Sequence, residues 1–149
     1  MLAASLDPAV DRVEVLTDGD VPVLHFGWPG GSLPVAYQGE GVHAAFRIGL
    51  SLTALSGGVA LLEEPEAHLH PAAMVLVAKA IINAVRSGTQ VVLTTHSLEF
   101  IDRLVDEVGD DAELLTLFTV WLNDGRLMSA RHDGDEVRFA RGEIAEDLR

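Results

Sequence analysis

Two short apolar runs, separated by a segment of helix length, constrain the fold of this chain most strongly. The first run covers residues 59–62, and the second lies within a predicted buried strand at residues 90–95, with the sequence QVVLTT. Between them, Pro71 suits the first position of a helix that the sequence predicts to continue to about Arg86. Continuous apolar runs are typical of parallel strands buried on both faces, and parallel neighbours are joined by a right-handed crossover. The sequence therefore predicts an α/β fold around a parallel sheet.

The segment before this unit predicts two strands, a loop and a helix. Residues 13–16 and 21–26 favour short strands on either side of a turn. Residues 27–34 are rich in Gly and Pro and predict a loop. Over residues 42–55 the apolar side chains recur at helical spacing. We therefore expect a helix to lead into the first buried strand.

The segment after this unit predicts a third helix and then strands. Ser97 can cap that helix, and Glu99 would lie near its positive end. Residues 114–139 favour strands, with turns at residues 123–125 and at residues 133–134. The sequence thus predicts a C-terminal β-hairpin beside the parallel sheet.

Charged and polar side chains follow both apolar runs, at the point where each predicted strand ends. Glu63 and Glu64 follow the first run, and His96 follows the second. Open α/β sheets bind their ligands at the carboxyl ends of the strands. Two adjacent carboxylates are costly at such a place without a counter-charge, and a hydrated Mg²⁺ ion would supply one. The pattern indicates a site at this edge.

Three motifs resemble those of ABC-type ATPases, and most of all the RecF-like and OLD-type branch. Residues 61–71, with the sequence LLEEPEAHLHP, resemble the extended Walker B motif and D-loop. Residues 94–97, TTHS, resemble the H-loop, and residues 38–41, QGEG, resemble the signature loop. The separations leave room for a helix and a strand between successive motifs. The resemblance is strong over about residues 33–104 and weak on both flanks, and it implies that residues 1–149 form a partial P-loop NTPase fold of the ABC ATPase type.

The resemblance also implies roles for the site residues and a need for ATP and Mg²⁺. Glu63 takes the position that holds Mg²⁺, usually through water, although most ABC proteins have Asp there. Glu64 takes the position of the general base that activates the attacking water. His96 takes the position of the γ-phosphate sensor.

A dimer follows from the same resemblance. Gln38, Gly39, Glu40 and Gly41 would face the γ-phosphate of ATP bound to an opposing subunit. The D-loop would lie along the dimer interface. A second tetrapeptide, LSGG at residues 55–58, also resembles a signature loop, but no helix fits between it and Glu63. A signature loop must precede a helix so that its amides point at a phosphate, and we therefore interpret residues 55–58 as a helix stop.

The sequence lacks a Walker A motif, which needs a Gly-rich turn followed by Lys and Ser or Thr. The only lysine is Lys79, in the middle of a predicted helix. We therefore predict one incomplete domain that contains the signature loop, Walker B, D-loop and H-loop but no Walker A. Either the chain is truncated, or a partner half or subunit supplies that motif, or the ATP chemistry has been lost. We expect no turnover by the chain alone.

Net charge and hydropathy limit the partners. The formal net charge of −13 argues against a broad phosphate-binding surface, so any nucleic-acid contact is expected to come through a partner. No apolar run is long enough to span a membrane, and we expect a cytoplasmic protein without membrane contact.

Two other interpretations of these residues stay open. His68 and His70 could bind a metal, although no third nitrogen or sulfur ligand is near in sequence. As an alternative to an ATPase module, the chain could be a non-catalytic remnant that binds a partner through its sheet edge.

Overall fold

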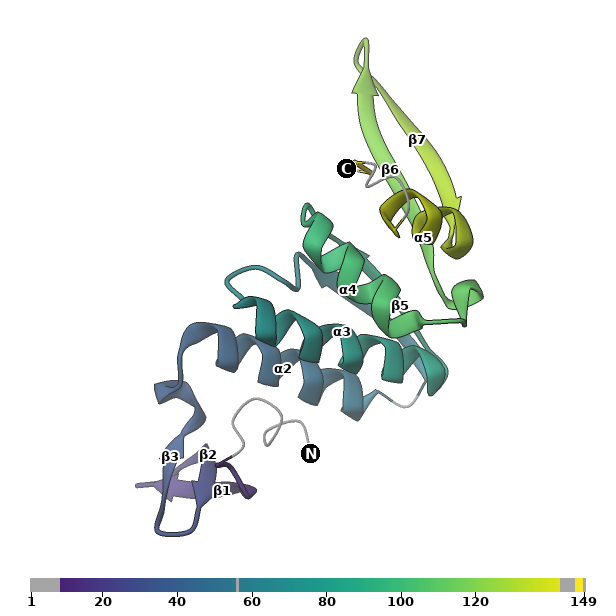
Figure 1. Ribbon diagram of the computed structural model, residues 1–149. Coiled ribbons are helices and arrows are strands. Elements are labelled where there is room, and N and C mark those ends of the chain that lie inside the picture. The colour runs from purple at the N-terminus through teal and green to yellow at the C-terminus, as the bar shows by residue number, and fades with distance from the viewer. Residues whose placement is uncertain (1–8, 56, 143–146, 149) are drawn as a thin grey trace.

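The computed structural model of the chain describes residues 9–55, 57–142 and 147–148. It begins with an antiparallel sheet of β1 (Arg12–Asp18), β2 (Val21–Trp28) and β3 (Gly31–Pro34), at the lower left of Figure 1. The predicted strands and the turn between them are confirmed. The predicted loop at 27–34 is wrong, because β2 and β3 pair across these residues and leave only a tight turn.

A helix and a parallel strand pair follow, as the sequence predicts. The 3₁₀ turn η1 (Val35–Tyr37) leads into α2 (Glu40–Ala54), and then come β4 (Gly58–Glu63), α3 (Pro71–Arg86) and β5 (Thr89–Thr94). β4 and β5 pair in parallel. Gly57 and Gly58 have positive φ angles; Gly57 lies between α2 and β4, and Gly58 is the first residue of β4. The interpretation of this segment as a helix stop is therefore confirmed; Ser56 lies outside the described residues.

The C-terminal part holds α4 (Leu98–Val108), η2 (Ala112–Leu114), the hairpin of β6 (Thr116–Asn123) and β7 (Arg126–Asp133), and α5 (Gly134–Gly142). Ser97 caps α4 as predicted, since its hydroxyl accepts a hydrogen bond from the amide of Phe100 (3.1 Å). The C-terminal hairpin is also confirmed, and it projects from the rest of the chain (Figure 1).

The second predicted turn, at residues 133–134, is instead the start of α5. The Asp133 carboxylate accepts from the amide of Glu136, and the Glu136 carboxylate accepts from the amide of Asp133 (both 3.0 Å). This reciprocal pair is a capping box, which begins a helix. The dipeptide Asp-Gly also favours a tight turn. The glutamate three residues after Asp133 is the signal that distinguishes a helix start from such a turn.

The main core lies between the β4–β5 sheet and the helices on one side of it. The most buried side chains of this core come from α2, α3 and α4 and include Leu52, Val77, Ile81, Phe100 and Leu104. A smaller core joins β2 to α2, where the rings of Phe26 and Phe46 meet edge to face, 4.9 Å apart. The helical layer thus covers one face of the parallel sheet.

The other face of the β4–β5 sheet is open to solvent. Along β4, Ala60 is 6% exposed, whereas its neighbour Leu61 is 77% exposed. Val92 on β5 is 50% exposed. The prediction of strands buried on both faces is therefore wrong, because within the described part of the chain only one face is covered.

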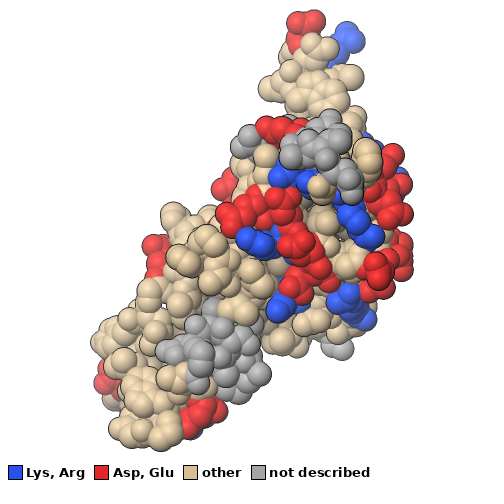
Figure 2. All heavy atoms as spheres, viewed as in Figure 1, with Lys and Arg blue, Asp and Glu red and all other residues tan. Residues whose placement is uncertain are grey.

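The charged side chains are unevenly spread over the surface. Figure 2 shows acidic and basic side chains next to one another over α4 and α5, and few charged side chains on this face of α2 and the β1–β3 sheet. Many of the basic groups are paired, such as Arg141 with Asp102 (2.7 Å) and Arg86 with Asp111 (2.7 Å). Within the described ranges, no helix combines the length and the apolar character that a membrane crossing requires.

Candidate functional site

The candidate site lies where β4 and β5 end side by side. Glu63 is the last residue of β4 and is in register with Thr94, the last residue of β5. The amide of Glu64 then donates to the carbonyl of Thr94 (3.0 Å), so the pairing continues one residue beyond the strand. The parallel register therefore brings the loops that follow the two strands to one edge, as the sequence predicts.

Glu64 has a strained backbone. Its φ angle is +41°, in the left-handed region, and His68 in the same loop has a φ angle of +64°. Residues with side chains adopt this region at a cost of about 1–3 kcal/mol, and such positions cluster at functional sites. The strand thus ends abruptly at Glu64, and the chain turns at once through Pro65, where the amide of Ala67 donates to the carbonyl of Glu64 (2.9 Å).

The turn places Glu64 beside His96. The Oε1 atom of Glu64 lies 3.6 Å from Nε2 of His96. Both side chains are open to solvent, with exposed fractions of 48% for Glu64 and 87% for His96. A carboxylate and an imidazole at this distance can together bind a water molecule or the oxygen of a ligand, and neither is buried by the chain itself.

Glu63 lies on the open face of the sheet. Because side chains alternate along a strand, Glu63 shares a face with Leu61 and Val59. These positions are exposed along β4, and Glu63 and Leu61 line a shallow hollow together with Leu62, Val92, Leu93 and Thr94. The Glu63 carboxylate is therefore accessible at the end of the uncovered surface.

The motif at residues 38–41 starts α2 and packs against the loop that follows β4. Gly39 is the N-cap of α2, so this motif precedes a helix as predicted. A Cβ atom on Gly41 would lie 2.9 Å from the carbonyl oxygen of His68, which is too close. Gly41 is thus required because the two backbones approach each other, a reason that the sequence alone does not reveal.

Glu66 is a site residue whose position the sequence analysis did not predict. The D-loop resemblance implies an outward position along an interface, but Glu66 is only 8% exposed. Its Oε1 atom accepts a hydrogen bond from the hydroxyl of Thr95, in the loop after β5. The signal was present in the sequence, since a hydroxyl residue follows the second strand, but the pairing needs the register between the strands.

One of the two histidines of the loop caps a helix. The Nδ1 atom of His70 accepts from the amide of Ala72 (3.2 Å), so His70 caps α3. Among the described residues, no group of three or more His, Cys, Asp or Glu side chains could hold a metal ion.

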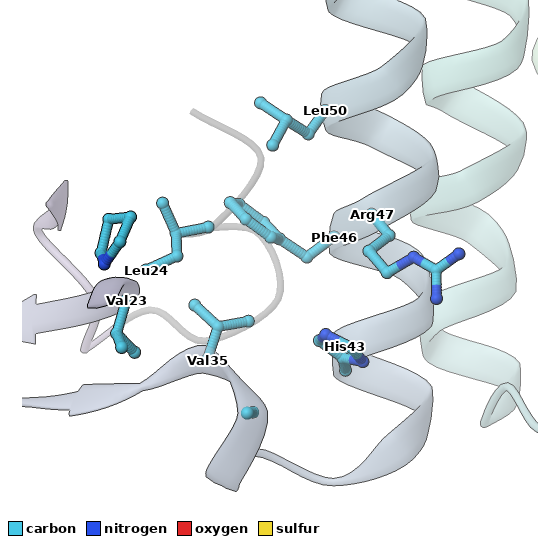
Figure 3. Close-up of a pocket in the computed structure, with 9 residues that line it drawn as sticks. Val23, Leu24, Val35, His43, Phe46, Arg47 and Leu50 are labelled. Carbon is cyan, nitrogen blue, oxygen red and sulfur yellow. The ribbon is translucent and has the colours of Figure 1, made fainter. Parts of the chain in front are cut away.

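A separate hollow lies between β2 and α2, away from the strand ends. Figure 3 shows Phe46 extending from α2 towards Leu24 and Val35, with His43 and Arg47 also on the helix side. Its walls are mostly apolar, and three of the lining residues, Leu24, Val35 and Phe46, are part of the smaller core. This hollow shares no residue with the candidate site.

The fold is that of ABC-type ATPase heads. A structure of an SMC ATPase superposes with a TM-score of 0.67 at 14% identity, over 98% of this chain and 88% of the other. An Smc head bound to the C-terminal winged-helix domain of ScpA gives 0.63 at 15% identity, and an Smc head bound to the C-terminal domain of ScpA, derived from Pyrococcus furiosus, gives 0.60 at 16%. The matches cover 89% and 97% of this chain, but only 40% and 36% of those two structures.

Sequence comparison identifies the family within this class. Residues 4–102 match the family described as "AAA domain, putative AbiEii toxin, Type IV TA system", and the chain belongs to that family of ABC/AAA-type ATPase domains. The uncharacterized protein MJECL11 of Methanocaldococcus jannaschii is 31% identical over 113 residues, which cover 75% of this chain and 99% of that protein. Residues 4–102, which match the family, include all three motifs.

Proposed function

We propose that this chain is an ATP-hydrolysing module that supplies the signature loop, Walker B, D-loop and H-loop and takes its Walker A motif from another half or subunit. Glu64 is the general base, and His96 contacts the γ-phosphate. The observation that carries the proposal is the 3.6 Å approach of Glu64 to His96 beyond a parallel strand pair, with a strained backbone at Glu64. Catalytic groups must lie within reach of one reacting atom, and two side chains 3.6 Å apart are close enough to contact the same atom.

Mg²⁺ fits the residues at the end of β4. The chain offers the exposed Glu63 carboxylate at the site, and the described residues contain no cluster that could enclose a metal. Mg²⁺ is commonly held by one or two carboxylates together with waters and substrate phosphates. Glu63 would hold it in this way, and the ion would neutralise charge on the phosphates.

The open face of the sheet supports the proposal that a P-loop half packs against it. Parallel sheets are almost always covered on both faces, yet Val59, Leu61 and Val92 are each at least half exposed on one face of this sheet. The P-loop half covers this apolar surface and thereby brings its phosphate-binding loop next to Glu63. The lysine that a P-loop requires cannot be Lys79, which lies within α3 and pairs with Glu107 (3.8 Å).

Dimerisation is part of the proposal. In the assembled protein, Gln38, Gly39, Glu40 and Gly41 face the γ-phosphate of ATP on an opposing subunit. The SMC ATPases, whose fold this chain shares, show ATP-driven dimerization and DNA-stimulated activation. We extend the first property, ATP-driven dimerization, to this chain through its signature loop and D-loop.

Because the chain is acidic, any contact with nucleic acid is expected to be made by a partner protein. The chain acts in the cytoplasm.

ATP turnover tests the proposal. The chain is purified alone and together with a Walker A-bearing polypeptide encoded beside it, and phosphate release is measured. Turnover is expected only in the mixture. Glu64→Gln should lower kcat by about 10²-fold or more, because it removes the base while keeping the shape of the side chain, and ATP binding should be retained.

Glu113→Gln is the matched control, because Glu113 is an exposed glutamate in η2, away from the strand ends. It should leave turnover unchanged. Turnover by the chain alone, or full activity in Glu64→Gln, would refute the proposal.

The alternative is a protein-interaction module without catalysis. The exposed apolar face favours it, since that face can bind a partner whether or not ATP is hydrolysed. Stable association with the P-loop half without any turnover in the mixture would support this alternative.

A further inference from the structure

Glu66 is a buried carboxylate that the proposed ATP chemistry does not use. Its side chain is 8% exposed, and the Thr95 hydroxyl donates to its Oε1 atom. Among the described residues, its Oε2 atom is buried and has no hydrogen-bond partner. Burying a carboxylate costs free energy that a single hydroxyl offsets only in part. A glutamate at this position therefore calls for a role beyond packing.

The Thr95 hydroxyl connects this carboxylate to the start of α4. Thr95 Oγ1 donates to Glu66 and accepts from the amide of Ser97 (3.0 Å). Ser97 in turn caps α4 by accepting from the amide of Phe100. The chain of hydrogen bonds thus runs from the first turn of a core helix to the loop after β4.

The same bond lies next to both groups of the candidate site. Thr95 directly precedes His96, and Glu66 follows Glu64 by two residues, inside the turn that Glu64 begins. The two loops also meet where the amide of Glu64 donates to the carbonyl and the hydroxyl of Thr94, and where the Glu64 carboxylate approaches His96. Because Glu64 holds a strained φ angle, its loop needs contacts that oppose relaxation.

We propose that Glu66 is a positioning residue, which holds Glu64 beside His96 through its hydrogen bond with Thr95. The catalytic consequence of this inference rests on the proposed function, whereas the structural coupling does not. A displacement of about 1 Å in a reacting group can cost about 10²-fold in rate, so a bond that fixes two loops can matter without touching the substrate. If the role of Glu66 were purely structural, its substitution would lower the stability of the chain and leave Glu64 in place beside His96.

Amide hydrogen exchange tests the coupling without any nucleotide. In the full chain, Thr95→Val removes the hydroxyl and keeps the shape, and the Glu64 amide should then exchange about tenfold faster, the equivalent of one hydrogen bond. Glu66→Leu should have the same effect, whereas Thr95→Ser, which keeps a hydroxyl, should not. An unchanged Glu64 amide in Thr95→Val would overturn the inference.

Thr119→Val is the matched control for this experiment. Thr119 also donates a partly buried hydroxyl hydrogen bond, to the carbonyl of Leu148 (2.8 Å), but it lies on the hairpin. The Glu64 amide should exchange at its original rate in this variant. Faster exchange there would show a general loss of stability and would also overturn the inference.

Kinetics of the assembled ATPase test the consequence. Thr95→Val and Glu66→Leu should each lower kcat by about tenfold or more with little change in KM. The double variant should be no worse than Thr95→Val alone, because both changes break the bond between Thr95 and Glu66, and Thr95→Val also removes the acceptor for the Ser97 amide. Glu66→Gln, which keeps an acceptor for Thr95, should restore most of kcat.

Additive losses in the double variant, or a change confined to KM, would refute the positioning role. If the unmodified assembly shows no turnover, the proposed function fails, and the exchange experiment still decides whether Glu66 couples the loops.

Discussion

The two faces of the β4–β5 sheet are made by neighbouring residues of the same strands, yet they have opposite environments. On β4, Ala60 is buried under the helices, and Leu61 points away from them and is 77% exposed. On β5, Val91 packs against the core, and Val92 is 50% exposed. Side chains that alternate in environment are usual for an antiparallel sheet with a polar outer face, but here the outer face is apolar.

The covered face contributes to the stability of the chain, whereas in the proposed function the open face serves assembly. Apolar residues exposed together on a sheet are unfavourable in water, and such surfaces mark sites of association. Glu63 ends the open face, so the surface that would bind a partner half leads directly to the candidate metal-binding carboxylate. Association and completion of the site would then be one event.

The largest expected effect compares a core residue on the covered side with its counterpart on the open side. Ile81→Ala should destabilise the chain by about 2–5 kcal/mol, because Ile81 on α3 is 2% exposed and its loss leaves a cavity. Leu61→Ala should change the stability by no more than about 0.5 kcal/mol, as for other surface sites. Urea unfolding followed by circular dichroism measures both. Similar losses in the two variants would contradict the division between the faces.

An intermediate effect concerns association. Leu61→Asp should leave the fold of the chain intact but weaken binding to the P-loop half by about 30-fold or more, because it places a charge at the centre of an apolar interface. Titration calorimetry measures the Kd.

Val15→Asp provides the control, since Val15 on β1 is 64% exposed and belongs to the other sheet. It should bind as tightly as the unmodified chain. Equal weakening by both variants would show that the open face has no special part in assembly.

The sequence predicted the strand–helix–strand unit and the starts of α3 and α4 well, because local signals specify them. Pro71 at the start of α3 and Ser97 at the cap of α4 are found where the sequence placed them. The uncovered face could not be predicted, because a run such as residues 59–62 is equally apolar on both sides. Burial of one side depends on which helices pack there.

The burial of Glu66 and the close approach at Gly41 also needed the structure. Glu66 meets Thr95 across the sheet, from a loop 29 positions away. Gly41 meets the backbone at His68, which lies beyond β4 in the chain. Both contacts join loops that only the parallel register of β4 and β5 and the packing of α2 bring together. The sequence supplied the residue types and left the partners open.

The smallest expected effect uses two adjacent valines on β5 and is the most direct test of the division. Val91→Ala removes two methyl groups from the covered side and should cost about 1–2.5 kcal/mol. Val92→Ala makes the same change on the open side and should cost no more than about 0.5 kcal/mol in the chain alone. Backbone pairing and strand propensity change equally in the two variants, so the difference in the free energy of unfolding reports burial alone. In the assembly with the P-loop half, the difference between the destabilising effects of Val91→Ala and Val92→Ala should become smaller or change sign, because Val92 then becomes buried. A persistent difference of the original size in the assembly would show that the partner does not cover this face, and the Walker A motif would have to reach Glu63 by another route.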